Sequence, residues 1–451
     1  MVHLFEWKWT DVAKECEEFL QHYGYGAVQV SPPQEHVYLT KSDDFPWWAR
    51  YQPVSYKLSS RSGNRTQFID MVNRCNQVKV RIVVDVVLNH MTGIGMKKGS
   101  NGVSSTGDSD FDARAEHINF PGVPYTKVDT NDHKCNHDIA DSDYTQNVNN
   151  VRNCRLVGLI DINQGSERVR SKIVEYLNDL IDIGVAGFRF DASKHMWPHD
   201  LKVIIQRVKN LRVDIFGANQ RPFVVHEVID RGNEAAKAYD YLEIGRYTDF
   251  TYGALLTAIT RYEHKDFRQN FQDKNSNFVH KIPKSFKKFC FSDLQWWGPG
   301  YGYGSFESHD LLVFIDNHDN QRDSNPYVLT YKDESLYAML VGFMLSWNYG
   351  YPRVMSSYVF NDFNKGPPNH GVQRRYEIKS PEFEIAYKTC NRSSGWVCEH
   401  RWQAIRGMTL FRQNVMNTGT KIQYAQGQRL AFSRGTKGFF AVNNDADDWT
   451  V

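Results

Sequence analysis

Three short strings in the sequence each place an acidic residue after a run of apolar residues. The strings are GFRFDASKH, HEVID and FIDNHDNQR, and their acids are Asp191, Glu227 and Asp319. Such runs are typical of buried parallel strands, and barrel enzymes place their chemistry at the ends of these strands. Glycoside hydrolysis needs one acid that protonates the leaving oxygen and one carboxylate that attacks or stabilises the anomeric carbon. The strings therefore predict an active site for sugar chemistry.

The residues next to these acids suggest how their roles divide. Side chains two apart in a strand share a face, so Arg189 and Asp191 are predicted to point together, as are Asn317 and Asp319. The arginine favours the ionised form of Asp191, which a nucleophile needs, whereas Glu227 lies between valines and is better placed to stay protonated. The alternative for any single acid is a structural ion pair or a strand-end cap. Three acids in matching contexts favour the catalytic interpretation.

Composition excludes some classes of partner. The 451 residues include 54 basic and 52 acidic ones, and the net charge of +2 predicts neither a nucleic acid nor an anionic membrane as partner. No apolar stretch approaches the roughly 20 residues that a membrane-spanning helix needs. Aromatic residues make up 14% of the chain, which suits stacking on sugar rings, although many large aromatics are simply core residues.

Strand and helix patterns alternate through the first two thirds of the chain, as in a parallel sheet. Strands are predicted at VHLF, AVQV and RIVVDVV, with helices near 10–20 and from Thr66 onward. Between about 90 and 160 the pattern gives way to Gly, Ser, Asn and Asp, which predicts a loop-rich insertion after the third strand. A helix capped by Ser166 and ending near Gly184 follows it.

The remaining strand patterns bring the predicted total to about eight. GFRFD, PFVVHE, LLVFIDNHD and the run around VGFML are interpreted as strands, and eight parallel strands would close a barrel. The aromatic and Gly-rich stretch 263–308 is predicted to be a long surface loop. From about 410 the pattern changes to antiparallel strands, with RLAFSR and FFAVNN around a turn at 435–438. We expect a small β domain there, and we expect the chain to stop inside it.

Cysteines and sequons favour an extracellular setting. The seven cysteines form no Cys-x-x-Cys pair of the zinc-binding kind, so a disulfide framework is expected. Cys16 and Cys75 lie on the apolar faces of two predicted helices and would meet if these helices are neighbours. Two glycosylation sequons, at Asn64 and Asn391, also fit secretion. Met1 directly precedes the strand-like VHLF, so we expect a signal peptide to be absent from this chain.

Taken with their order and spacing, several motifs resemble those of the animal-type alpha-amylases. They are VHLFEWKW, VQVSPP, PWWARYQPVSYKL, VVDVVLNH, GVAGFRFDASKHMWP, HEVID, FIDNHDNQR, GFMLSWNYGYPRVMSSY and GWVCEHRW. The resemblance covers nearly the whole chain. It implies an α/β fold built on a (β/α)8 TIM barrel. The implied units are a catalytic barrel (1–89 and 161–408), a domain B (90–160) and the start of a Greek-key domain C (409–451).

The resemblance also implies an activity and the residues that perform it. Endo-hydrolysis of α-1,4-glucosidic bonds in starch and glycogen is expected, with retention of configuration through a covalent glycosyl intermediate. Asp191 would be the nucleophile, Glu227 the general acid/base and Asp319 the third acid that grips sugar hydroxyls. The implied substrate-binding residues are Trp47, Trp48, Tyr51, Gln52, His90, Lys194, His195, Glu234 and His318. A single histidine, lysine or glutamate of this set would otherwise be read as structural or solvated.

Two ions follow from the same resemblance. Asn89 and Asp161, with the backbone carbonyls of Arg152 and His195, match the calcium ligands of the family, and calcium prefers such oxygen ligands. The alternative for Asn89 and Asp161 is an ordinary cap or turn. Arg189, Asn317 and Arg353 match its chloride site. A buried anion near Glu227 favours the protonated form of that acid, so chloride is expected to be an activator.

Disulfides, partners and alternatives complete the prediction. The implied bridges are Cys16–Cys75, Cys135–Cys154 and Cys390–Cys398, while Ser59 occupies a further cysteine position of the family. We expect a secreted monomer that binds starch, glycogen and malto-oligosaccharides, and neither nucleic acid nor membrane. Two other functions remain open at this point: a catalytically silent relative that only binds glucans or a protein, and an enzyme that transfers the glycosyl group to a sugar instead of water.

Overall fold

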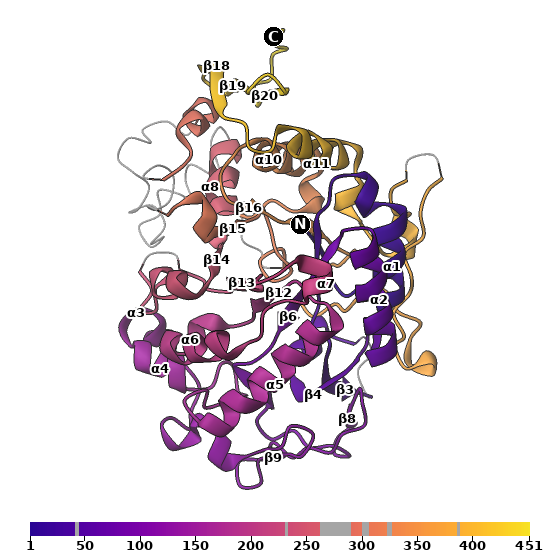
Figure 1. The fold of residues 1–451 in the computed structure, drawn as a ribbon, viewed down its shortest axis with the longest axis vertical. Helices are drawn as coiled ribbons and strands as arrows, with labels where there is room; N and C mark the ends of the chain where they lie inside the picture. Colours follow the sequence, from indigo (N-terminus) through magenta and orange to yellow (C-terminus); the bar gives the residue numbers. More distant parts are fainter. Residues whose placement is uncertain (41–44, 231–232, 262–289, 300–305, 323–326, 386–387) are drawn as a thin grey trace.

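A closed ring of parallel strands forms the centre of the molecule (Figure 1). The computed structural model describes residues 1–40, 45–230, 233–261, 290–299, 306–322, 327–385 and 388–451. The ring consists of β1 (Val2–Leu4), β2 (Ala27–Val30), β6 (Arg81–Val86), β12 (Gly187–Phe190), β13 (Phe223–His226), β14 (Arg246–Asp249), β15 (Leu311–Val313), β16 (Tyr351–Pro352) and β17 (Val354–Ser356).

The ring closes at its last strand. β16 pairs with β15 and β17 pairs with β1, both in parallel, and only Arg353 separates β16 from β17. These two short strands are therefore the two halves of an eighth barrel strand. Because these strands are buried on both faces, their sequences are continuous apolar runs and do not alternate between apolar and polar residues. The predicted TIM barrel is confirmed.

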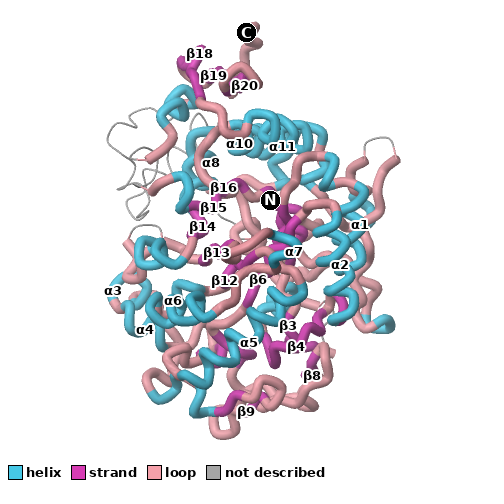
Figure 2. Tube along the Cα trace, viewed as in Figure 1, coloured by secondary structure: helices cyan, strands magenta, loops and turns pink. Residues whose placement is uncertain are grey.

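Helices surround the strands, as Figure 2 shows. Those on the barrel are α1 (Trp9–Glu18), α2 (Arg65–Gln77), α5 (Glu167–Ile183), α6 (Pro198–Arg207), α7 (Val213–Phe216), α8 (Phe250–Arg261) and α10 (Glu334–Ser346). α5 starts after Ser166 and stops at Gly184, whose φ of 114° lies in the left-handed region, so both predicted ends are confirmed. A 3-10 helix, η6 (Ala238–Ile244), connects β13 to β14.

One predicted strand is wrong. The run VGFML lies within α10, where residues 340–346 are all buried. A helix buried on every side shows no amphipathic period, so a short apolar run in it looks like a buried strand. The true final strand is the less apolar YPRVMS that follows.

The predicted loop-rich insertion lies between β6 and β12, and its part around β8 and β9 forms one end of the molecule in Figure 1. Its strands and helices are all short. They include the strands β7 (His90–Gly93), β8 (Val103–Ser105), β9 (Asn119–Phe120), β10 (Tyr125–Thr126) and β11 (Leu159–Asp161), the 3-10 helix η4 (Asn131–His133) and the helices α3 (Asp143–Gln146) and α4 (Val148–Asn153). β8 pairs with β3 (Gln34–Leu39), which in turn pairs with β4 (Pro53–Ser60), and β5 (Gly63–Asn64) extends that sheet. The insertion is thereby attached to the loop after β2.

The opposite end carries an antiparallel sheet of β18 (Thr420–Gln426), β19 (Arg429–Arg434) and β20 (Gly438–Asn443), which confirms the predicted strand pair and adds β18 (Figure 1). The helix α11 (Gln403–Val415) runs through position 409, where the third domain was expected to begin. Most of the stretch 263–308 lies outside the described residues, and its described part contains the 3-10 helix η8 (Phe291–Trp296).

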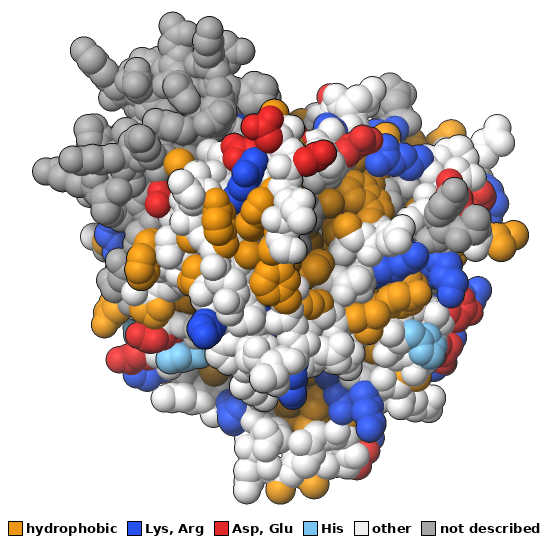
Figure 3. All heavy atoms as spheres, turned by 90° about the horizontal axis from the view of Figure 1, so that it is seen from above, with side chains coloured by type: hydrophobic (Ala, Val, Ile, Leu, Met, Phe, Trp, Pro, Cys, Tyr) orange, Lys and Arg blue, Asp and Glu red, His pale blue; other side chains and the backbone are white. Residues whose placement is uncertain are grey.

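Three disulfides are present, in the pairing that the resemblance implies. Cys16–Cys75 joins α1 to α2, Cys135–Cys154 lies in the insertion, and Cys390–Cys398 precedes α11. Figure 3 views the end that carries the antiparallel sheet, where basic and acidic side chains are interspersed and do not form a field of one sign. Among the described residues, helices with the length and apolar character required to cross a bilayer are absent.

The tight packing of β12 against β13 can be tested at Gly187. A Cβ atom there would lie 2.3 Å from the backbone oxygen of Phe223, and backbone cannot move aside as a flexible side chain would. We expect Gly187→Ala to lower the free energy of unfolding by about 2 kcal/mol or more. Gly26→Ala is the matched control, because nothing lies within 4 Å of its new Cβ. Equal denaturation midpoints for the two variants would contradict this packing.

Candidate active site

A single buried guanidinium gathers the acids at the mouth of the barrel. Arg189 lies on β12, and its Nη1 donates to Asp85 Oδ1 at 2.6 Å and to Asp191 Oδ1 at 2.9 Å. Its Nη2 lies 2.6 Å from Glu227 Oε1. Asp85 is the register partner of Arg189 on the neighbouring strand β6. Three carboxyl groups from three adjacent strands or strand ends therefore meet on one cation.

Asp191 and Glu227 are close enough to act on one bond. Each directly follows a barrel strand, β12 or β13. Both contact the same guanidinium, whose two terminal nitrogens are about 2.3 Å apart, so the contacted oxygens lie within about 8 Å of each other, inside the range that glycosidases use. The backbone N–H of Ala192 also donates to Glu227 Oε2 at 2.8 Å, which fixes the orientation of that carboxyl group.

The structure corrects the expectation that the cation distinguishes Asp191 from Glu227. Arg189 contacts both acids, because successive barrel strands direct alternate side chains to the same interior. The valines on either side of Glu227 are neighbours in sequence only and do not isolate its carboxyl group from charge. Proximity to arginine therefore does not assign the two roles.

Asp319 reaches the same cleft from a turn. β15 ends at Val313, so Asn317 and Asp319 do not share a strand face as expected. Instead, Asn317 Oδ1 accepts hydrogen bonds from the backbone N–H groups of Asp319 at 3.1 Å and Asn320 at 2.8 Å. An asparagine that caps its own backbone in this way replaces strand geometry with a tight turn. The turn places His318 beside Asp319, with Nε2 3.5 Å from Oδ2.

Burial and mutual repulsion favour retained protons in this cluster. Burial and then the charge of Glu227 raise the pKa of Asp191 well above its usual value, against the opposing effect of Arg189. The same two causes raise the pKa of Asp319 to about 7. Burial also raises the pKa of Asp85. The raised pKa values of Asp85, Asp191 and Asp319 favour a retained proton among these three neighbouring acids.

The acids line a cleft of about 400 Å³ together with most of the predicted substrate-binding residues. Those that line it are Trp47, Trp48, Tyr51, His90, Lys194, His195 and His318. Burial lowers the pKa of His90 to about 4 and that of His195 to about 3, so both rings are neutral at physiological pH. The cleft thus offers aromatic faces and neutral hydrogen-bonding groups around the carboxyl groups, which is how sugar sites are built.

Two predicted substrate residues, Gln52 and Glu234, are not among the residues that line this cleft. The side-chain oxygen of Gln52 accepts from Thr92 Oγ1 at 2.9 Å and from the backbone N–H of Gly93 at 3.1 Å. Glu234 accepts from Lys194 Nζ at 2.6 Å, so it holds a side chain that does line the cleft. Contact of either residue with substrate remains a prediction.

Some residues of the site had no signal in the sequence. Asp85 lies in the middle of RIVVDVV, and an acid inside a strand pattern looks like any buried polar residue. Its carboxyl group also accepts from Tyr51 Oη at 3.0 Å, which links the aromatic wall to Arg189. The apolar residues Tyr144, Leu156, Val157, Leu159 and Ile229, with Ala192, complete the lining. Tyr144 lies in the short helix α3, Leu159 begins the short strand β11, and the others lie outside helices and strands, so no periodicity marks them.

Unpaired donors gather on the inner side of the acids, around the predicted chloride residues. Arg353 interrupts the eighth strand and is 2% exposed. Its Nη1 donates to Gln29 Oε1 at 2.8 Å, whereas Arg353 Nη2 and Arg189 Nε find no hydrogen-bond partner in the described part of the chain. Burial and then the nearby charge of Arg189 lower the pKa of Arg353 to about 10. Two buried arginines with unused N–H groups fit an anion.

Unpaired oxygens gather where the predicted calcium residues lie. Asn89 Oδ1 and Asp161 Oδ1 are buried and have no donor within the described ranges. Burial raises the pKa of Asp161 well above its usual value, so an ionised carboxylate there requires a cation. His195 Nδ1 contacts the backbone oxygen of Val151 at 2.9 Å, which brings η5 (Ser193–His195) against α4, the helix that contains Arg152. Oxygen donors of this kind fit calcium.

Comparison with known proteins identifies the family. The family model for the alpha-amylase catalytic domain matches residues 18–344. Human alpha-amylase 2B is 46% identical over 464 residues, with 100% of this chain and 83% of that protein covered. The alpha-amylase of Tribolium castaneum is 44% identical over 443 residues, which cover 98% of this chain and 81% of the relative.

Solved structures give the same result. The crystal structure of wild-type alpha-amylase I from Eisenia fetida superposes with a TM-score of 0.84 at 37% identity, covering 98% of this chain and 83% of that one. A mutant of the same enzyme in complex with maltohexaose gives a TM-score of 0.83. The chain belongs to the alpha-amylase family and is an animal-type alpha-amylase.

Proposed function

We propose that this chain hydrolyses internal α-1,4-glucosidic bonds of starch and glycogen with retention of configuration. The observation that carries the proposal is the meeting of Asp191 and Glu227 on Arg189 at the floor of a cleft lined with aromatic rings. The Eisenia fetida relative solved with maltohexaose supports an oligosaccharide as ligand.

In the first step, one oxygen of Asp191 attacks the anomeric carbon while Glu227 donates its proton to the leaving glycosidic oxygen. The carbon–oxygen bond to the leaving glucan breaks, and a covalent bond to Asp191 forms. In the second step Glu227 removes a proton from water, the water oxygen attacks the same carbon, and Asp191 is released. Each step inverts the configuration, so the product retains the α configuration.

The surrounding residues support these steps. Glu227 is held for proton transfer by Ala192 N–H, and Arg189 stabilises the charge that returns to Asp191 when the intermediate breaks down. Asp319 and the neutral rings of His90 and His318 are placed to bind sugar hydroxyls near the reacting carbon. Trp47 and Trp48 provide stacking faces for further glucose rings.

Chloride is proposed as the activator of this site, held by Arg189, Asn317 and Arg353. A bound anion would compensate the charge of Arg189. In its absence the full charge of Arg189 faces Glu227 across their 2.6 Å contact, which opposes the role of the glutamate as a proton donor. The unused N–H groups of Arg189 and Arg353 support this assignment.

Calcium is proposed as a structural ion, held by side-chain oxygens of Asn89 and Asp161 and by the carbonyl groups of Arg152 and His195. It would supply charge compensation between the insertion and the barrel. Three disulfides support secretion into an oxidising environment.

The first test separates a hydrolase from a silent glucan-binding relative and from a transferase. We expect the protein to release reducing ends from soluble starch, and Asp191→Asn and Glu227→Gln to lower kcat by at least about 1000-fold because each removes a group that no neighbour replaces. Reducing-sugar assay gives the rate, and chromatography of the products distinguishes hydrolysis from transfer. Starch binding without release of reducing ends in the wild type would refute the proposal.

The second test concerns the anion. In rigorously halide-free buffer we expect most activity to be lost and sodium chloride to restore it, whereas sodium gluconate at the same ionic strength does not. Arg353→Gln should weaken the response to chloride at least about tenfold, because one of two charged donors is lost. The measurement is kcat/KM as a function of chloride concentration. Full activity of the wild type without halide would contradict the assignment.

A further inference from the structure

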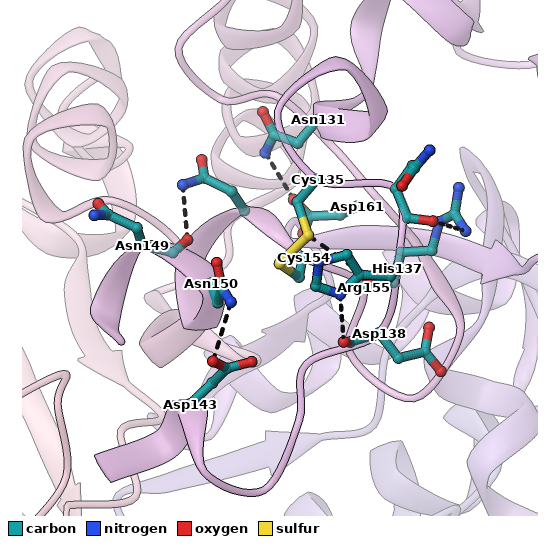
Figure 4. The surroundings of a disulfide bond; sticks show 12 residues. Asn131, Cys135, His137, Asp138, Asp143, Asn149, Asn150, Cys154, Arg155 and Asp161 are labelled. Carbon is teal, nitrogen blue, oxygen red and sulfur yellow. Dashed lines mark hydrogen bonds between the residues drawn. A yellow bond between two sulfur atoms is a disulfide. The ribbon is translucent and has the colours of Figure 1, made fainter. Parts of the chain in front are cut away.

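Asn131 lies beside Asp161, and neither the sequence nor the resemblance gives it a role. It begins η4 in the insertion and is 2% exposed. Its Nδ2 donates to Asp161 Oδ2 at 2.7 Å and to the backbone oxygen of Ile162 at 3.2 Å (Figure 4). An asparagine side chain is thus buried against a buried carboxylate.

The two acceptors fix the orientation of the amide. A carboxylate and a backbone carbonyl only accept, so the NH2 group of Asn131 must face them and Oδ1 must point elsewhere. That oxygen is buried and has no hydrogen-bond donor within the ranges the structure describes. Asn89 Oδ1 and Asp161 Oδ1 share this property. Each buried oxygen without a partner is destabilising, so three of them on adjoining segments indicate a shared positive partner.

These three segments are fixed to one another by the backbone. The N–H of Ile162 donates to Asn89 O at 2.9 Å, and Thr130 forms a β-bridge with Ile162. The disulfide Cys135–Cys154 then ties the residues after η4 to the end of α4 (Figure 4). The backbone therefore sets the relative positions of the three segments that carry the unpaired oxygens.

We propose that Asn131 is a positioning residue of the calcium site. Its NH2 group engages one oxygen of Asp161 and leaves the other for the cation, and its own Oδ1 adds a neutral oxygen to the wall of the site. Calcium takes six to eight oxygen ligands, so a neutral amide oxygen in the wall suits it. The inference rests on the calcium site of the proposed function and extends it to a residue outside the expected ligands.

The test compares Asn131→Ala with Asn150→Ala. Asn150 is a matched control, because its Nδ2 also donates to a buried aspartate of the insertion, Asp143 Oδ1, at 3.0 Å. Calcium dissociation constants are measured on the metal-free full chain by competition with a chromophoric chelator. We expect calcium to bind Asn131→Ala about 10–100-fold more weakly than wild type, as is typical when a ligand loses its supporting hydrogen bond. The calcium dissociation constant of the control should stay within about threefold of the wild-type value, because Asp143 is not one of the proposed calcium ligands.

Asn131→Asp gives a second readout in a variant that keeps nearly the size of the asparagine, in case the alanine of Asn131→Ala prevents folding. It places a carboxylate beside Asp161, and the repulsion is relieved only when a cation is present. We expect its Tm to fall more in chelator than in excess calcium, whereas Asn150→Ala should lose the same amount in both.

The outcomes are distinct. Equal calcium affinity for Asn131→Ala and Asn150→Ala, or a Tm loss in Asn131→Asp that is independent of calcium, would overturn the role of Asn131 alone. Failure of the wild-type chain to bind calcium would overturn the site itself, and with it this inference.

Discussion

The charge balance around one buried arginine is the constraint on which the site depends. Arg189 is 1% exposed and contacts Asp85, Asp191 and Glu227. A buried guanidinium is costly unless it is paired, and buried carboxyl groups are costly unless they are neutralised. The barrel satisfies both by directing these side chains from neighbouring strands to one point. The same arrangement brings two carboxyl groups within reach of one glycosidic bond, which glycoside hydrolysis requires.

The eighth barrel strand and the insertion both contribute to this charge balance. Closure of the ring at Arg353 places a second buried arginine near Arg189, and burial, followed by the charge of Arg189, lowers the pKa of Arg353 to about 10. An anion between two such cations reduces their repulsion and weakens the hold of Arg189 on Glu227. The insertion contributes buried oxygens that have no donor within the described residues and that suit a cation. The site thus combines buried arginines suited to an anion with buried oxygens suited to a cation.

Much of the fold and of the site could be predicted from the sequence, wherever the local residue pattern agrees with the position of a residue in its helix or strand. Asp191 and Glu227 directly follow strands whose apolar runs are unambiguous, and the end of α5 at Gly184 follows from a residue that tolerates a positive φ. The resemblance added the ions and the disulfide pairing. Two predictions failed for different reasons. VGFML lies in a helix that is buried all round, so its sequence shows no helical period. Asn317 lies in a turn because its side chain bonds to the backbone of that turn. Asn131 was missed because only the folded chain places it against Asp161.

The most direct measurement is the identity of the residue that becomes glycosylated. Glu227→Gln should still react with maltosyl fluoride, because fluoride leaves without a proton, but water should not be activated to break down the intermediate. Mass spectrometry of the digested variant is then predicted to show a maltosyl adduct on the peptide that contains Asp191, and none when Asp191→Asn is added. An adduct on another acid, or turnover of the fluoride with inversion and no adduct, would contradict the account.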